Sequence, residues 1–309
     1  MNGQALPAAV SIREVGLRDG LQIEEPIPFE SKLLLLEAIV ATGVPRVEAT
    51  AFVSPRAVPS MADAEQVAGA LGRWPKVAFS GLVASPNGAR RAVAAGVVDL
   101  EYVISAAPSH SLANVRMTTE AAVTAAEEVI RVAHEAGGRC EVIIATAWDC
   151  PFDGRTDPAR VTDIARRTAE MGADQLCLGD TIGTTSPLRV VDLVERVRAV
   201  APGLSVGAHF HNTRGTGIAN ALAAVQAGVT QLDASVGGLG GCPFAPGATG
   251  NIATEELLYL LQEMGIVTGM DLDATVTAAA LAQELVGHPV PSSLLKAGGR
   301  SVPRGPIES

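Results

Sequence analysis

One repeated pattern limits the possible folds of this chain more than any other feature: β-rich segments alternate with helical ones eight times. We expect strands at residues 10–15, 46–51, 77–83, 98–104, 140–146, 175–179, 205–210 and 231–236. We expect helices near residues 30–42, 62–74, 87–95, 119–136, 158–171, 187–200, 217–227 and 254–264. A glycine followed by a β-branched residue closes several of these helices, as in Ala95-Gly-Val, and this is a typical helix stop.

This alternation predicts the α/β class. Strands that alternate with helices form parallel sheets, and eight such units within 309 residues favour a (β/α)8 TIM barrel. We expect a single domain over residues 1–309, with the barrel at about 10–266, an additional C-terminal helix at about 272–287 and a frayed tail at 298–309. A doubly wound open sheet is the alternative, but no Gly-x-Gly-x-x-Gly motif follows the first strand.

Charge and hydropathy exclude several classes of partner. The formal net charge of −10 argues against nucleic acid and against anionic membrane surfaces. No apolar run is long enough for a membrane span, and the N-terminus lacks the pattern of an export signal, so we expect a soluble, cytoplasmic protein. The cysteines form no Cys-x-x-Cys pair, so a disulfide framework is not expected. We expect Cys140, Cys150 and Cys177 to be packing residues in or beside strands.

The seventh predicted strand carries a pair of histidines. Side chains alternate along a strand, so His209 and His211 point to one face and Phe210 to the other. TIM barrels carry their chemistry at the carboxyl ends of the strands, where Asp19 and Asn251 can join the histidines around one cation. Two imidazoles, a carboxylate and an amide oxygen suit Mg²⁺ or Mn²⁺, and zinc is a further possibility. The simpler interpretation is a pair of structural histidines.

Other polar residues lie at the same strand ends and complete the set of candidates. They are Arg18, Gln22, Glu48, Ser54, Asp180, Thr181, Ser235 and Cys242. For three of them a simpler interpretation is the alternative: Glu48 would only pair with Arg18, Asp180 would only start a loop, and Cys242 would be an inert small residue. His110 is expected in a loop without a role in the site.

Several motifs resemble those of a known family. They are Glu14-Val-Gly-Leu-Arg-Asp-Gly-Leu-Gln22, Glu48-Ala-Thr-Ala-Phe-Val-Ser-Pro, Leu178-Gly-Asp-Thr-Ile-Gly183, His209-Phe-His211, and the glycine loop from Val236 through Cys242 to Glu255. Residues 10–290 therefore resemble the 3-hydroxy-3-methylglutaryl-CoA lyase family, metal-dependent TIM-barrel lyases related to Claisen-type synthases. The cysteine loop, in this order after the histidine pair, is specific to the lyase branch of that family.

The resemblance implies a role for each candidate residue. The divalent cation, Mg²⁺ or Mn²⁺, would be bound by Asp19, His209, His211 and Asn251. The catalytic residues would be Arg18, Asp180, His209 and Cys242. Substrate binding or support of the site would involve Gln22, Glu48, Ser54, Thr181, Arg214 and Glu255.

The reaction implied by the resemblance is a retro-Claisen cleavage. Its substrate would be 3-hydroxy-3-methylglutaryl-CoA or a close 3-hydroxy-3-alkylglutaryl-CoA analogue, and its products acetyl-CoA and a 3-oxoacid. A homodimer that acts on an acyl-CoA in leucine degradation is the corresponding expectation. Coenzyme A phosphates need cations, for which the candidates are Arg56, Arg90 and Arg91.

The chain departs from the family pattern at the expected pocket wall. The family has His-x-His-Asp-Thr-Tyr-Gly-Gln on strand seven, whereas this chain has Asn212, Arg214 and Thr216 at the changed positions. Ile143 replaces a tyrosine on strand five. These changes leave citramalyl-CoA or a related hydroxyacyl-CoA open as the substrate.

Two other functions are alternatives. A Claisen condensing synthase or pyruvate aldolase would use the same scaffold, but the cysteine loop and the absence of a long C-terminal regulatory region disfavour it. A metal-free barrel with a binding or scaffold role is the second alternative. The four predicted cation ligands are all present in the sequence and disfavour that function.

Overall fold

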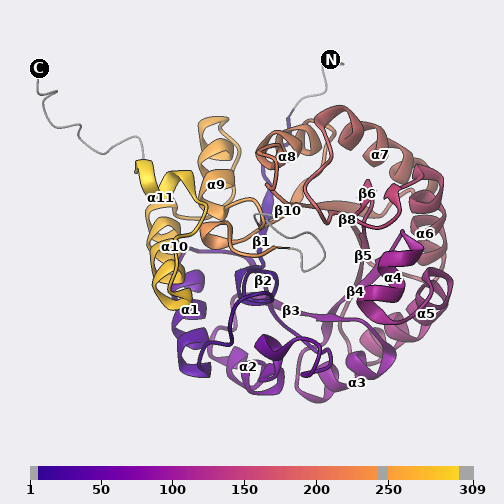
Figure 1. Ribbon diagram of the computed structural model, residues 1–309, viewed down its shortest axis with the longest axis horizontal. Coiled ribbons are helices and arrows are strands. Elements are labelled where there is room, and N and C mark those ends of the chain that lie inside the picture. The colour runs from indigo at the N-terminus through magenta and orange to yellow at the C-terminus, as the bar shows by residue number, and fades with distance from the viewer. Residues whose placement is uncertain (1–5, 242–249, 299–309) are drawn as a thin grey trace, which may run out of the picture.

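The protein forms a closed barrel of parallel strands surrounded by helices (Figure 1). The computed structural model describes residues 6–241 and 250–298. Within them, eight strands pair in the order β1-β10-β9-β8-β5-β4-β3-β2. These strands are β1 (Ser11–Glu14), β2 (Arg46–Ala51), β3 (Ala78–Val83), β4 (Asp99–Ser105), β5 (Cys140–Ala145), β8 (Gln175–Asp180), β9 (Ser205–Phe210) and β10 (Gln231–Ala234). The predicted TIM barrel is confirmed.

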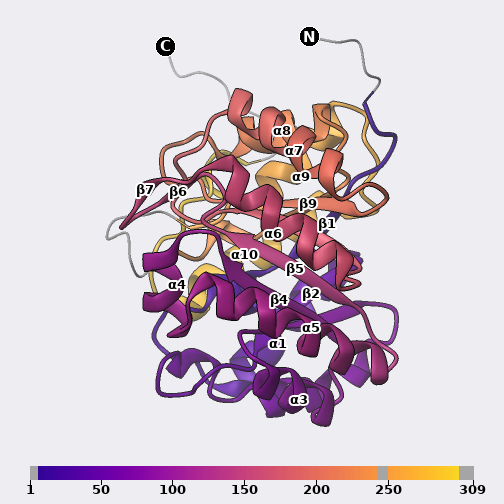
Figure 2. The ribbon, with the colours of Figure 1, turned by 90° about the vertical axis from the view of Figure 1, so that its right-hand side faces the viewer.

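A helix follows each barrel strand and covers its outer side (Figures 1 and 2). These helices are α1 (Phe29–Ala41), α2 (Ala64–Ala70), α3 (Pro86–Ala94), α5 (Thr119–Glu135), α6 (Pro158–Glu170), α7 (Pro187–Val200), α8 (Gly217–Gln226) and α9 (Thr254–Glu263). Several of these helices begin with a capping side chain or a proline in the first turn. The side chain of Asp157, for example, accepts a hydrogen bond from the Ala159 N–H at 2.9 Å, and Pro158 occupies the first turn.

The predicted additional C-terminal helix is α10 (Leu272–Val286), which packs against α1 and α9 and is followed by the short α11 (Ser293–Ala297). Most of the tail expected at 298–309 lies outside the described residues. Among the helices that the structure describes, none is both long and apolar enough to cross a bilayer.

The strands are buried on both faces, as parallel barrels require. All residues of β5 and β8 are buried, and Val, Ile, Leu and Ala fill the layer between strands and helices. The three cysteines within the described residues, Cys140, Cys150 and Cys177, are buried with free thiols, as expected for packing residues.

Short elements at the ends of the strands were not predicted. They are the π-helix η1 (Gly16–Gly20), the 3₁₀-helices η2 (Pro59–Met61), η3 (Leu71–Arg73) and η4 (Val236–Gly238), the hairpin of β6 (Asp149–Cys150) and β7 (Gly154–Arg155), and α4 (Pro108–Val115). The loop expected around His110 is therefore wrong, because α4 contains this residue. Elements this short lack a periodic pattern, and their contacts with the barrel decide whether they form.

Candidate active site

The first part of the site is the π-helix η1, which directly follows β1. The N–H of Leu21 donates to the carbonyl of Gly16 at 2.9 Å, one residue further along than in an α-helix. This wider turn places two consecutive charged side chains inside the barrel mouth, where Arg18 is 6% and Asp19 is 9% exposed. Gly16 is required at the start of the turn, because a Cβ there would lie 2.6 Å from the carboxylate of Glu14.

Asp19 and the two histidines of β9 form a group that fits a metal ion. Their candidate ligand atoms all lie within 4.8 Å of one another. Nε2 of His209 lies 3.8 Å, and Nε2 of His211 lies 3.5 Å, from Oδ2 of Asp19. The Nδ2 of Asn251 donates to the same Oδ2 at 2.7 Å, while the buried Oδ1 of Asn251 has no hydrogen-bond partner among the described residues. This oxygen and the three other groups form a donor set that can hold a divalent cation.

The carboxylate of Asp19 stays ionised despite its burial. Burial alone would raise its pKa, but the charge of Arg18 and the hydrogen bond with His211 hold the pKa well below its usual range. An ionised carboxylate is the form that binds a cation.

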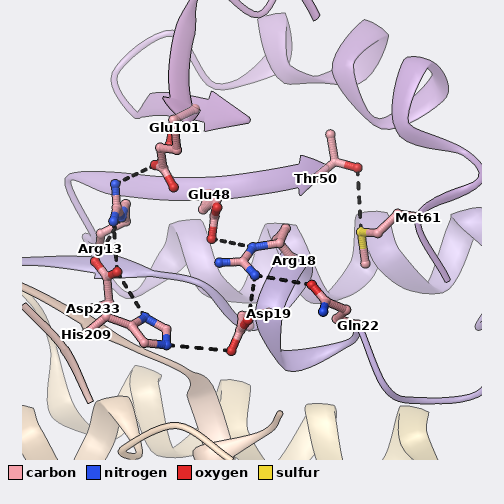
Figure 3. Close-up of polar contacts among 12 residues, drawn as sticks. Arg13, Arg18, Asp19, Gln22, Glu48, Thr50, Met61, Glu101, His209 and Asp233 are labelled. Atoms are coloured by element: carbon pink, nitrogen blue, oxygen red, sulfur yellow. Dashed lines mark hydrogen bonds and ion pairs between the residues drawn. The ribbon is translucent and has the colours of Figure 1, made fainter. Parts of the chain in front are cut away.

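Arg18 is held by three side chains (Figure 3). Its Nε donates to Glu48 at 2.6 Å, and its Nη1 donates to Asp19 at 2.5 Å and to Gln22 at 3.3 Å. Burial alone would lower the pKa of the guanidinium, but the charges of Glu48 and Asp19 raise it above the usual value. The site therefore contains a permanent, oriented cation beside the metal-binding group.

Two buried glutamates lie beneath Arg18. Glu48 and Glu101 are 0% and 1% exposed, and one oxygen of each has no partner that satisfies hydrogen-bond geometry among the described residues. Burial, followed by the charge of Glu101 and a hydrogen bond with it, raises the pKa of Glu48 well above its usual value, although Arg18 opposes this. A neighbouring carboxylate in a dry interior disfavours the ionised form of Glu48.

A further charged cluster lies deeper in the barrel, and the sequence analysis did not identify it. Arg13 on β1 donates through Nε and Nη2 to Asp233 at 2.9 and 2.8 Å, and it forms ion pairs with Glu101 at 2.5 Å and Glu141 at 2.9 Å. Asp233 in turn contacts His209 (Figure 3). Charged residues in the middle of predicted barrel strands are rare, and this rarity could have revealed the cluster.

A cavity of about 840 Å³ lies above these groups, at the carboxyl ends of the strands. The predicted site residues that line it are Arg18, Asp19, Gln22, Ser54, Thr181, His209 and His211. Ile143 and the candidate cations Arg56 and Arg91 line it as well. Arg90 does not, because it forms a surface ion pair with Glu128 at 2.6 Å.

His110 also lines the cavity, so the prediction of a residue without a place in the site was wrong. It is 3% exposed, and its Nδ1 lies 2.9 Å from the hydroxyl of Ser105. Burial lowers the pKa of His110 to about 4, so the imidazole is neutral near pH 7.

Besides Glu48 and Asn251, described above, three further predicted residues lie outside the cavity lining. Asp180 accepts hydrogen bonds from the N–H groups of Thr184 and Thr185 at 3.1 and 3.3 Å. Arg214 donates to the carbonyl of Ile182 at 2.9 Å. Glu255 accepts from the N–H of Gly237 at 3.1 Å. Asp180 and Arg214 therefore hold the segment after β8, and Glu255 holds the start of the glycine loop.

The two ends of the glycine loop meet at the metal-binding group. A Cβ on Gly240 would lie 2.6 Å from Nδ2 of Asn251, and a Cβ on Gly250 would lie 2.4 Å from the carbonyl of Gly240. Only glycines permit this approach of the two backbone segments. Cys242 lies outside the described residues, and its neighbour Gly241 lines the cavity.

The chain is similar to several known proteins. The profile of the HMGL-like family matches residues 9–282. A hydroxymethylglutaryl-CoA lyase of Bacillus subtilis is 36% identical over 291 residues, which cover 94% of this chain and 97% of the relative. An (R)-citramalyl-CoA lyase of Chloroflexus aurantiacus is 39% identical over 303 residues, which cover 94% of this chain and 95% of the relative.

A solved structure shows the same similarity. It is an HMG-CoA lyase from Acinetobacter baumannii in complex with coenzyme A and 3-methylmalate, with a TM-score of 0.92 and 37% sequence identity. The match covers 98% of this chain and 99% of that chain. The π-helix, the histidine pair and Asn251 all fall within the family match at residues 9–282.

Proposed function

The chain belongs to the HMGL-like family, and from this premise we propose that it is a metal-dependent carbon–carbon lyase. It cleaves 3-hydroxy-3-methylglutaryl-CoA, or a close 3-hydroxy-3-alkylglutaryl-CoA analogue, to acetyl-CoA and a 3-oxoacid. The observation that carries the proposal is the juxtaposition of the Asp19–His209–His211 group with the oriented guanidinium of Arg18 below one large cavity.

In this proposal, Asp19, His209, His211 and Asn251 hold Mg²⁺ or Mn²⁺ through one carboxylate oxygen, two Nε2 atoms and Oδ1. When bound, the cation would supply a Lewis acid for the 3-hydroxyl of the substrate. A base removes the hydroxyl proton. The carbon–carbon bond then breaks, and its electron pair passes to the thioester, which leaves as an enolate.

The protein supplies three groups for these steps. The two candidate bases for the hydroxyl proton are His209, which lines the cavity, and Asp180, which ends β8 outside the cavity lining. Arg18 stabilises the enolate oxygen, because a fixed cation costs no reorganisation when the charge develops. Cys242 donates a proton to the enolate carbon and thereby completes acetyl-CoA.

Acetyl-CoA release from a panel of coenzyme A esters tests the function. With Mg²⁺ present, 3-hydroxy-3-methylglutaryl-CoA or a 3-alkyl homologue should release acetyl-CoA and a 3-oxoacid. The same protein should not condense acetyl-CoA with 2-oxoacids. Condensation without cleavage of any 3-hydroxyacyl-CoA would show a Claisen synthase instead.

Citramalyl-CoA is the second candidate substrate. The Chloroflexus aurantiacus relative is a citramalyl-CoA lyase, and Ile143 lines the cavity where the family pattern has a tyrosine. An apolar wall there provides no hydroxyl for a distal carboxylate. In the same panel, citramalyl-CoA would release acetyl-CoA and a 2-oxoacid, and the ratio of the two kcat/KM values decides between the substrates.

The role of Cys242 gives a specific prediction. A proton-donating thiol should be reachable, so an alkylating reagent should inactivate the enzyme through Cys242, and substrate should protect it. Cys242→Ser should keep the bound cation but lose most of the turnover, because a hydroxyl is a much poorer acid than a thiol. Cys150→Ser is the matched control, since this thiol is buried and should leave inactivation unchanged. Wild-type turnover in Cys242→Ser would assign the proton to another group.

We also propose a homodimer located in the cytoplasm, with a role in leucine degradation if 3-hydroxy-3-methylglutaryl-CoA is the preferred substrate. Sedimentation of the full chain tests the dimer, and the substrate ratio above tests the metabolic role.

A further inference from the structure

The imidazole of His209 is supported from below by a buried acid. Oδ2 of Asp233 lies 3.1 Å from Nδ1 of His209, and Asp233 is 5% exposed. Nε2 of the same ring faces Asp19. The two nitrogens of His209 therefore have separate partners, the acid on one side and the metal-binding group on the other.

Closure of the barrel places Asp233, its partner Arg13 and His209 in one row across three neighbouring strands. In the strand register, Arg13 on β1 is opposite Asp233 on β10, and Asp233 is opposite His209 on β9. Residues in register on neighbouring parallel strands point to the same side of the sheet. Arg13 then donates to both carboxylate oxygens of Asp233, which fixes the plane of the carboxylate (Figure 3).

This row determines which nitrogen of His209 carries the proton. Both oxygens of Asp233 already accept from Arg13, so the carboxylate can only accept from the imidazole. The proton of a neutral His209 therefore lies on Nδ1, and the lone pair of Nε2 is directed at the metal-binding group. His211 differs, because its Nδ1 has no hydrogen-bond partner among the described residues.

We propose that Arg13 and Asp233 are positioning residues for the cation: Arg13 orients Asp233, and Asp233 fixes the tautomer and ring plane of His209. This inference rests on the metal site of the proposed function. Partners of this kind typically change metal affinity by about 10- to 100-fold when they are replaced.

The substitution Asp233→Asn tests the proposal. Its amide nitrogen must replace one carboxylate oxygen. In either orientation it meets a donor of Arg13, and in one of them it also directs an N–H at Nδ1 of His209. The affinity of the purified full chain for Mn²⁺, measured by titration without substrate, should fall by about 10- to 100-fold. Thermal unfolding of each variant is recorded in parallel.

Glu141→Gln is the matched control. Glu141 also accepts from Arg13, at 2.9 Å, and is similarly buried, but its side-chain partners among the described residues are Arg13 and Arg46 rather than His209. This variant should keep its Mn²⁺ affinity within a few fold of wild type. Equal losses in Asp233→Asn and Glu141→Gln would overturn the positioning role, because they would show a general effect of weakening the Arg13 cluster.

Nitrogen-15 NMR of the five histidines in the Mg²⁺-loaded wild type gives a direct and independent readout. The ring signals that are present in the wild type and absent from His209→Gln belong to His209. These signals should show a protonated Nδ1 and a metal-bound Nε2. A protonated Nε2 would overturn the inference, even if Asp233→Asn does not fold. Unchanged Mn²⁺ affinity in Asp233→Asn would overturn it too and would leave the proposed function intact. A wild type that binds neither ion would instead contradict the proposed metal site.

Discussion

Removal of the divalent cation should abolish turnover, and Asp19→Ala or His209→Ala should weaken cation binding strongly. Each substitution deletes one side chain of the Asp19–His209–His211 group, whose ligand atoms lie within 4.8 Å of one another. Loss of a ligand should exceed the roughly 10- to 100-fold change typical of residues that only support a ligand. The measurements are the Mn²⁺ affinity of each variant and acetyl-CoA release after chelation and after readdition of Mg²⁺.

His134→Ala is the control for the histidine variant. His134 lies on the outer helix α5 and pairs with Asp174 at 2.9 Å, so its loss should change neither cation affinity nor turnover. Full activity in protein stripped of metal would contradict the metal-dependent mechanism. Activity restored by Mg²⁺ in wild type, but not in Asp19→Ala, would support it.

Arg18→Lys should lower kcat by about a hundredfold or more, by analogy with the removal of an oxyanion donor. The guanidinium contacts Glu48 through Nε and contacts Asp19 and Gln22 through Nη1. A lysine ammonium keeps the charge but cannot reproduce this planar arrangement. Because the enolate charge develops only in the transition state, the change should be much larger in kcat than in KM.

Arg189→Lys is a matched control for Arg18→Lys. Arg189 is a partly buried arginine that, like Arg18, donates to a carboxylate, here Asp149 at 2.7 Å, but it does not line the cavity. Its replacement reports the general cost of exchanging arginine for lysine in an ion pair. An Arg18→Lys enzyme with a raised KM and a near-normal kcat would assign Arg18 to substrate binding rather than to charge stabilisation.

The fold was predictable because its determinants are local. Each barrel strand is a short β-rich segment followed by a helix and, in several units, a glycine stop, so the order of elements can be read along the chain. The predicted strand at 205–210 and the observed β9 (Ser205–Phe210) coincide. Boundaries differ more where a helix is short, as for α2 (Ala64–Ala70) against the expected 62–74.

The candidate site was predictable in part for a similar reason. The period of two along β9 is sufficient to place His209 and His211 on one face, and the TIM-barrel topology brings Asp19 to the same end. The position of His110 in the cavity wall was not predictable. It lies in α4, an eight-residue helix between β4 and α5, and packing against the barrel rather than a repeating pattern determines that helix.

By itself, the sequence determined the barrel and the order of its strands, because these follow from the alternation of β-rich and helical segments. It also determined the face on which the histidines lie, because side chains alternate along a single strand. Only the tertiary structure decided which buried charges meet. Arg13 and Asp233 are 220 residues apart, and they pair because barrel closure places β1 beside β10. Glu48 and Glu101 come together across the same interior. A local pattern reports that a side chain is buried, but the partner of a buried charge is set by strand register across the closed barrel, which no single segment contains.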